Sequence, residues 1–143
     1  MLRSLLVAAT LALTLPALAQ EVNTIEGFYS GSGEGELSMD LTHLDEDRYA
    51  IDIGTLVPME NDMPGCAGGI SGEVLLTKRG GNFFVENEDY DPNVTLLSHR
   101  QCEIAISFDG KGGVTLEEKE GCLSFHGAAC GFSGTLTHDA GGI

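Results

Sequence analysis

Ser124 and His126 are the two side chains whose types and spacing come nearest to a nucleophile and its general base. They lie two positions apart, which in an extended segment puts both side chains on one face with their Cβ atoms well separated. No Gly-x-Ser-x-Gly sequence surrounds the serine, although that sequence exposes the nucleophile of many hydrolases. We therefore expect a structural polar pair and assign no catalytic residue, which leaves a hydrolase as the least favoured functional hypothesis.

Four cysteines could form disulfide bonds or bind a metal: Cys66, Cys102, Cys122 and Cys130. The Cys-x-x-Cys spacing typical of zinc sites is absent, so two disulfide bonds are the favoured interpretation. Three connectivities are possible for four cysteines. We predict that Cys66 pairs with Cys102 and Cys122 with Cys130, because the second pair brackets a short glycine-containing turn that can bring its ends together.

The other candidate metal ligands do not follow a known pattern. The four histidines have no paired spacing of the kind found in metal sites: His43, His99, His126 and His138. Residues 89–93 place oxygen ligands at alternate positions, as a calcium loop does. However, Val94 stands where the glycine of such a loop belongs, and Arg100 stands where its bidentate glutamate belongs. We therefore predict neither a metal nor a cofactor.

Acidic residues far outnumber basic ones, with 22 Asp and Glu against 7 Lys and Arg and a formal net charge of −15. Nucleic acid is a poor partner for such a chain, because binding to phosphates needs Lys and Arg to replace counterions. A basic protein fits the charge, although acidity can also serve solubility alone. Two acidic turns are the candidate sites for such a partner: Asp45, Glu46 and Asp47 in one, and Glu86, Glu88, Asp89 and Asp91 in the other.

The chain begins with the three consecutive parts of a secretory signal peptide. Arg3 precedes a short apolar run, and a small-x-small triplet ends at Ala19, just before Gln20. The apolar run is shorter than the roughly 20 residues needed to cross a bilayer, so we predict no membrane span. We expect residues 1–19 to be removed and residues 20–143 to form a single β domain in the periplasm or outside the cell.

Short runs of alternating apolar and polar residues, separated by Gly, Asn and Asp, predict β-strands along the whole domain. Three hairpins are expected, over residues 37–55, 70–85 and 104–116, with turns at 45–47, 79–82 and 109–113. Outer strands are expected at 28–32 and 132–137. About seven or eight strands joined by short turns predict an all-β domain, either a small antiparallel up-and-down barrel or a compact sandwich. Either arrangement protects the strand edges, and we favour the barrel.

The most distinctive segment runs from Cys122 to Gly134, where Phe125 and Phe132 can pack around a disulfide-closed, glycine-rich turn. Together with the Gly-Phe-Tyr-Ser-Gly sequence at 27–31, this segment resembles small exported bacterial β-barrel proteins, mostly uncharacterised, that are close to periplasmic lysozyme inhibitors. The chain lacks the lipid-attachment cysteine of the membrane-bound inhibitors, and no inhibitory-loop residue is carried over. The resemblance implies a compact β-barrel that binds or inhibits another protein.

Two functional hypotheses follow from the charge and the resemblance. The first is a non-enzymatic periplasmic or secreted binding or inhibitor domain, directed against a basic enzyme such as a lysozyme. A negative surface would speed its encounter with a cationic target. The alternative is an envelope-associated structural module without a soluble target, in which the acidic surface provides only solubility.

Overall fold

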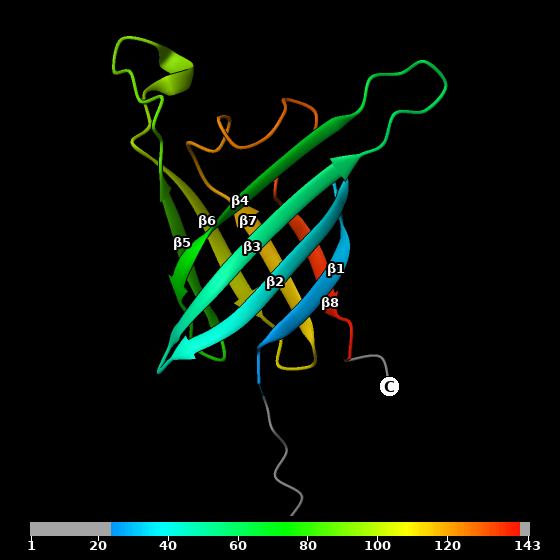
Figure 1. Cartoon of the computed structure of the whole chain (residues 1–143), viewed down its shortest axis with the longest axis vertical. Helices are drawn as coiled ribbons and strands as arrows, with labels where there is room; N and C mark the ends of the chain where they lie inside the picture. The colour runs from blue at the N-terminus through cyan, green and yellow to red at the C-terminus, as the bar shows by residue number, and fades with distance from the viewer. Residues whose placement is uncertain (1–23, 141–143) are drawn as a thin grey trace, which may run out of the picture.

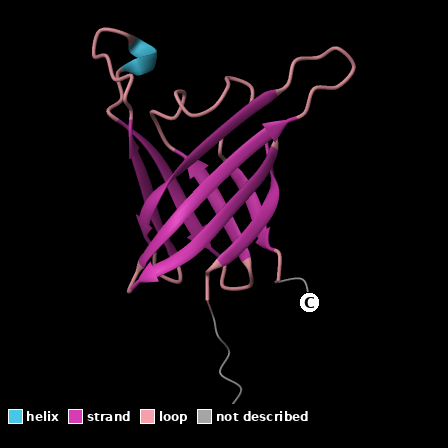
Figure 2. Cartoon of the chain, in the orientation of Figure 1, coloured by secondary structure: helices cyan, strands magenta, loops and turns pink. Residues whose placement is uncertain are grey.

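The alternating sequence folds into an antiparallel β-barrel in the computed structural model, which describes residues 24–140 (Figure 1). The strands are β1 (Gly27–Gly33), β2 (Glu36–Asp45), β3 (Arg48–Val57), β4 (Cys66–Leu75), β5 (Gly80–Glu86), β6 (Gln101–Phe108), β7 (Gly113–Glu118) and β8 (Gly134–His138). A single 3₁₀ turn, η1 (Thr95–Leu97), is the helical element of this part of the chain (Figure 2). The predicted all-β, disulfide-stabilised barrel is confirmed, and the predicted signal peptide lies outside the described residues.

The strand order β4-β3-β2-β1-β8-β7-β6-β5 puts the first and last strands side by side in the sheet. Strands β1 and β8 pair from Tyr29 with His138 to Gly33 with Gly134, so the two ends of the domain are joined by backbone hydrogen bonds. The barrel is therefore interrupted at a seam between β4 and β5, in the middle of the sequence, and not between its first and last strands.

The predicted hairpins over 37–55 and 104–116 are confirmed as β2 with β3 and β6 with β7. The predicted hairpin over 70–85 is wrong: its two strands form, but they share no ladder, and only an isolated bridge joins Thr77 to Gly80. The ring of Phe83 packs in the core against β4 at this seam, where a Cβ atom on Gly72 would lie 3.3 Å from it.

One face of every strand contributes to the core, as expected for period-two alternation. The largest fully buried side chains of the core include Phe83, Phe132, Met39, Leu41, Ile53, Leu76, Ile104 and Leu116. Burying one such side chain stabilises the fold by about 1.5–3 kcal/mol.

Tyr29 is a polar side chain in this core, and its ionisation would disturb the packing. It is only 2% exposed, and its hydroxyl donates a hydrogen bond of 2.7 Å to the carbonyl oxygen of Ile25. Burial, with a smaller effect from the neighbouring Tyr49, raises the pKa of Tyr29 to about 12. Both causes act against the charged phenolate and so favour the neutral hydroxyl.

The raised pKa of Tyr29 predicts that the protein loses stability at alkaline pH. Below the ordinary value of 10.0 the tyrosine is protonated in both states. Between that value and about 12 the unfolded chain releases the proton while the folded chain keeps it, so the free energy of unfolding falls. Urea unfolding of the wild type and of Tyr29→Phe across this range should show a shallower decline in the variant. Equal declines in the two proteins would contradict this origin of the pH dependence.

The two ends of the barrel differ in the length of their connections (Figure 1). The long-loop end carries the connections 58–65, 87–100 and 119–133, which join β3 to β4, β5 to β6 and β7 to β8, and also the tight turn 34–35 between β1 and β2. The short-turn end carries the tight connections after β2, β4 and β6, together with the start of β1 and the end of β8. Because loops on a rigid scaffold are the usual place for binding residues, the long-loop end is the first place to look for a site.

Candidate protein-binding surface

The two predicted acidic turns lie at opposite ends of the barrel and cannot form one site. The turn at 45–47 joins β2 to β3 at the short-turn end, and the acidic residues at 86–91 begin the β5–β6 connection at the long-loop end. Because neighbouring strands are antiparallel, successive connections along the chain alternate between the two ends of the barrel. A sequence that shows two acidic turns does not show which end each occupies.

The turn at 45–47 is partly neutralised by a neighbouring guanidinium. Arg48 donates from Nε to Oδ1 of Asp45 at 3.0 Å and from Nη1 to Oε2 of Glu73 at 3.0 Å. These contacts make the pKa of Asp45 lower than usual, chiefly through the hydrogen bond from Arg48. Glu46 and Asp47 are exposed beside this pair. The turn therefore offers less free negative charge than its sequence suggests.

The acidic loop at the long-loop end is held in place by an asparagine that the sequence did not single out. Asn87 donates from Nδ2 to the carbonyl oxygens of His99 at 2.9 Å and Gly121 at 2.8 Å. Its backbone N–H also donates to the carbonyl oxygen of Arg100 at 2.8 Å. The guanidinium of Arg100 lies 4.4 Å from the ring centroid of Tyr90. Glu86, Glu88 and Asp89 are thus exposed on an anchored loop.

A second acidic segment at this end was also missed, namely the tip of the β3–β4 connection at residues 59–63, here called the methionine tip. Asn61 and Asp62 have φ values of 48° and 63°, and the N–H of Met63 donates to the carbonyl oxygen of Glu60 at 2.8 Å. Two left-handed residues closed by such a hydrogen bond make a tight hairpin turn. Met59 is 81% exposed and Met63 is 70% exposed, beside the exposed carboxylates of Glu60 and Asp62.

Other large apolar side chains are exposed at the same end. Leu96 is 69% exposed in η1, and Leu123 is 47% exposed in the connection between β7 and β8. Exposed apolar groups that share a surface with carboxylates are typical of protein-binding sites, where apolar contacts give affinity and charge gives orientation. The sequence signal for the methionine tip is an Asn-Asp turn between Pro58 and Pro64, which the strand pattern alone did not reveal.

The connection 119–133, here called the cross-loop, is fastened to β4 and β6 by both disulfide bonds. The bonds are Cys66 with Cys130 and Cys102 with Cys122, so the predicted pairing is wrong. Beyond β7 the chain continues beside β6, where the backbone N–H of Lys119 donates to the carbonyl oxygen of Glu103 at 2.8 Å. This antiparallel course brings Cys122 opposite Cys102, with their Cα atoms 4.5 Å apart.

The second half of the cross-loop then reaches the opposite side of the seam. The N–H of Gly127 donates to the carbonyl oxygen of Ala67 at 3.2 Å, and the N–H of Gly69 donates to that of Phe125 at 3.0 Å. Cys130 is thereby carried to Cys66 at the start of β4. Local turn geometry around Cys122 and Cys130 could not predict this, because both cysteines are held by distant strands.

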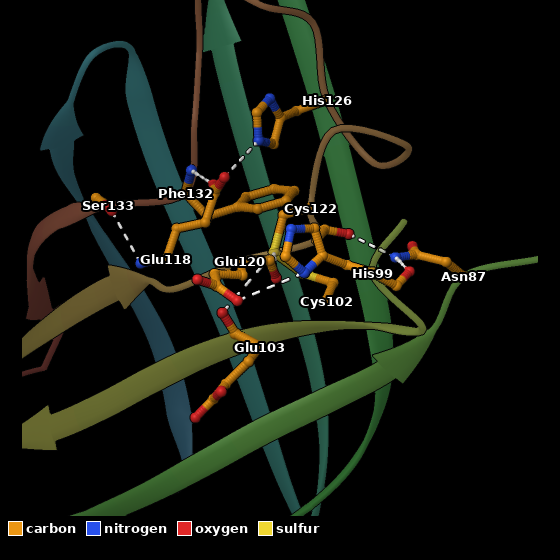
Figure 3. The surroundings of a disulfide bond; sticks show 11 residues. Asn87, His99, Cys102, Glu103, Glu118, Glu120, Cys122, His126, Phe132 and Ser133 are labelled. Carbon is orange, nitrogen blue, oxygen red and sulfur yellow. Dashed lines mark hydrogen bonds and ion pairs between the residues drawn. A yellow bond between two sulfur atoms is a disulfide. The ribbon is translucent and has the colours of Figure 1, made fainter. Parts of the chain in front are cut away.

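His126 is a buried anchor of the cross-loop (Figure 3). Its side chain is 5% exposed, with Nε2 at 3.0 Å from Oε1 of Glu118 and Nδ1 at 2.7 Å from the carbonyl oxygen of Gly127. The other carboxylate oxygen of Glu118 accepts a hydrogen bond of 2.9 Å from the N–H of Phe132. Both ring nitrogens are therefore engaged away from Ser124, which is exposed. The arrangement supports a structural role for His126 rather than that of a general base.

No three side chains of His, Cys, Asp or Glu within residues 24–140 lie together in a way that could hold a metal ion. All four cysteines are in disulfide bonds. In the same part of the chain, no helix is both long enough and apolar enough to cross a membrane. The two disulfide bonds fit a chain that folds outside the reducing cytosol.

No family model, curated protein or solved structure matches the chain.

Proposed function

We propose that this protein is a non-enzymatic periplasmic or secreted binding domain that recognises a basic protein, such as a lysozyme, through its long-loop end. The observation that carries the proposal is the methionine tip, which presents Met59 and Met63 beside Glu60 and Asp62 on a tight turn. Methionine side chains adapt to irregular apolar surfaces, and carboxylates attract lysine and arginine. A cationic protein with an apolar patch has the complementary chemistry.

The charge of the long-loop end supports a basic partner. Basic side chains there already have partners: Lys119 pairs with Glu117 at 2.8 Å, and Arg100 lies over the ring of Tyr90. The exposed carboxylates of the methionine tip and of the 86–91 loop make no ion pair within residues 24–140. Their field can therefore steer a cation toward this end.

Binding of several purified lysozymes, measured by biolayer interferometry at low and at physiological salt, tests the proposal. The charge-reversal variant Glu60→Lys with Asp62→Lys should slow association about tenfold, because it weakens the steering field at the methionine tip. Added salt should slow association of the wild type, since screening limits the field to about 8 Å at physiological ionic strength. The variant Met59→Ser with Met63→Ser should instead speed dissociation, because it removes apolar contact.

The matched control is Glu46→Lys with Asp47→Lys, which reverses two exposed charges at the short-turn end and should leave both rates within about twofold of the wild type. A cell-wall lysis assay then separates inhibition from simple binding. If no lysozyme or other basic protein binds at low salt, or if both ends respond equally, recognition through the long-loop end is wrong. The envelope-associated structural module then becomes the better account.

A further inference from the structure

The short-turn end contains a pocket of about 370 Å³ whose lining differs in charge from the rest of the molecule. Its floor includes Ile25, Tyr29 and Phe108, and its rim includes Lys78 and Lys111. A volume of this size is within the usual range for small-molecule sites, which are mostly apolar with a few polar groups that orient the ligand. The pocket is at the opposite end from the methionine tip and is independent of the proposed protein-binding surface.

Within residues 24–140, the two lysines at this pocket lack the ion pairs that hold Arg48 and Lys119. Arg48 is held by Asp45 and Glu73, and Lys119 is held by Glu117. Lys78 and Lys111 make no ion pair within residues 24–140, and both side chains are exposed at one pocket. In a chain with a formal net charge of −15, this pocket brings two lysines together with one carboxylate, that of Glu26, and Asp109 lies near Lys111.

The polar atoms of Tyr29 and His138 at this pocket already have hydrogen-bond partners. The hydroxyl of Tyr29 donates to the carbonyl oxygen of Ile25 at 2.7 Å. His138 accepts at Nδ1 from the N–H of Ala140 at 3.0 Å, so its Nε2 carries the proton and donates to the carbonyl oxygen of Glu26 at 2.9 Å. The remaining surface of these rings is aromatic carbon. A sugar or another many-hydroxyl ligand would find few free partners there.

The one carboxylate in the lining is also partly occupied. Oε2 of Glu26 accepts a hydrogen bond of 2.7 Å from the N–H of His43, which draws that oxygen toward β2. Gly110, in the turn that carries Lys111, has a φ of 75° and open space around the position of a Cβ. Among residues 24–140, the lysine side of the rim therefore remains open to an anionic group.

We propose that this pocket binds a small monocarboxylate with an apolar tail, such as a medium-chain fatty acid. Its carboxylate would lie between the ammonium groups of Lys78 and Lys111, and its tail would pack on Tyr29 and Phe108. A carboxylate is one charge and matches this pair of lysines, whereas a polyanion would be repelled by the strongly negative chain. The apolar tail is required because the floor offers ring faces and no free hydrogen-bond donor.

Octanoate titrated into the full exported protein, followed by amide NMR shifts and calorimetry, tests the proposal. Saturable shifts are expected at Gly110 and Gly112, and they should be much smaller with octanol, which lacks the charge. Lys78→Gln and Lys111→Gln should each weaken octanoate binding about tenfold, while Lys119→Gln at the other end should leave it unchanged. Such surface substitutions leave the fold intact.

Three outcomes would overturn the proposal. Binding of octanoate that is unchanged in both lysine variants would remove the role of the positive rim. Equal affinity for inorganic phosphate would indicate an anion site that makes no use of the apolar floor. Shifts confined to the long-loop end would place the ligand elsewhere. None of these results affects the lysozyme-binding test, because the two sites occupy opposite ends of the barrel.

Discussion

Replacing Cys66 and Cys130 together by serine should lower the free energy of unfolding by about 4 kcal/mol in the chain-entropy model. The bond closes a loop with a sequence separation of 64 and fastens the cross-loop to β4. The conformational entropy of the unfolded chain increases most when a disulfide that closes a long loop is removed. Urea unfolding monitored by circular dichroism measures the loss, with all other cysteines kept oxidised.

The second disulfide is the matched control, since it fastens the other half of the same loop. Cys102→Ser with Cys122→Ser releases a separation of only 20 and should cost about 3 kcal/mol. Peptide mapping without reduction should recover Cys66 joined to Cys130 and Cys102 joined to Cys122. Recovery of Cys122 joined to Cys130 would contradict the structure and return the pairing expected from the local sequence.

Gly31→Ala should be nearly as damaging, with an expected loss of about 3 kcal/mol, because the added methyl meets backbone that cannot move aside. A Cβ atom at this position would lie 2.0 Å from the carbonyl oxygen of Thr135 and 2.6 Å from the Cα of Leu136. Both atoms belong to β8, whose pairing with β1 joins the two ends of the domain. Relief of the contact would require these strands to separate.

Gly69→Ala provides the comparison, since it also adds one methyl to a strand glycine. The nearest atom to a Cβ there is the carbonyl oxygen of Ile53 at 3.9 Å, which is an ordinary contact. Unfolding in urea should show little change for Gly69→Ala and a much lower midpoint for Gly31→Ala. Similar midpoints for the two variants would mean that β1 and β8 are not held as close together as the structure has them.

Local features of the chain were predictable wherever a pattern and its turn are adjacent in sequence. Alternation around Met39 and Ile53 predicted β2 and β3, and the run that includes Ile104 and Leu116 predicted β6 and β7. Within the predicted strand at 28–32, Gly31 is required by the close approach of β8. In each case the evidence was the period of the side chains or the absence of a Cβ.

The candidate site was less predictable, because its parts are brought together by the barrel. Asn87 binds the carbonyl oxygen of Gly121 across 34 positions, and nothing in the neighbouring residues indicates this partner. The methionine tip depends on positive φ angles at Asn61 and Asp62. The lysine-rimmed pocket likewise joins Lys78 and Lys111 from separate turns. Sequence patterns indicate turns, but they do not indicate which turns meet.

By itself the sequence determined the fold class, the positions of the strands, the two adjacent hairpins and the strong negative charge, since each depends on residue types at short separation. Only the tertiary structure decided the pairing of Cys66 with Cys130, the seam between β4 and β5, and the separation of the two acidic turns to opposite ends. These features depend on the register and closure of the whole sheet. Closure is a non-local condition, because the last strand must return beside the first across the whole length of the chain.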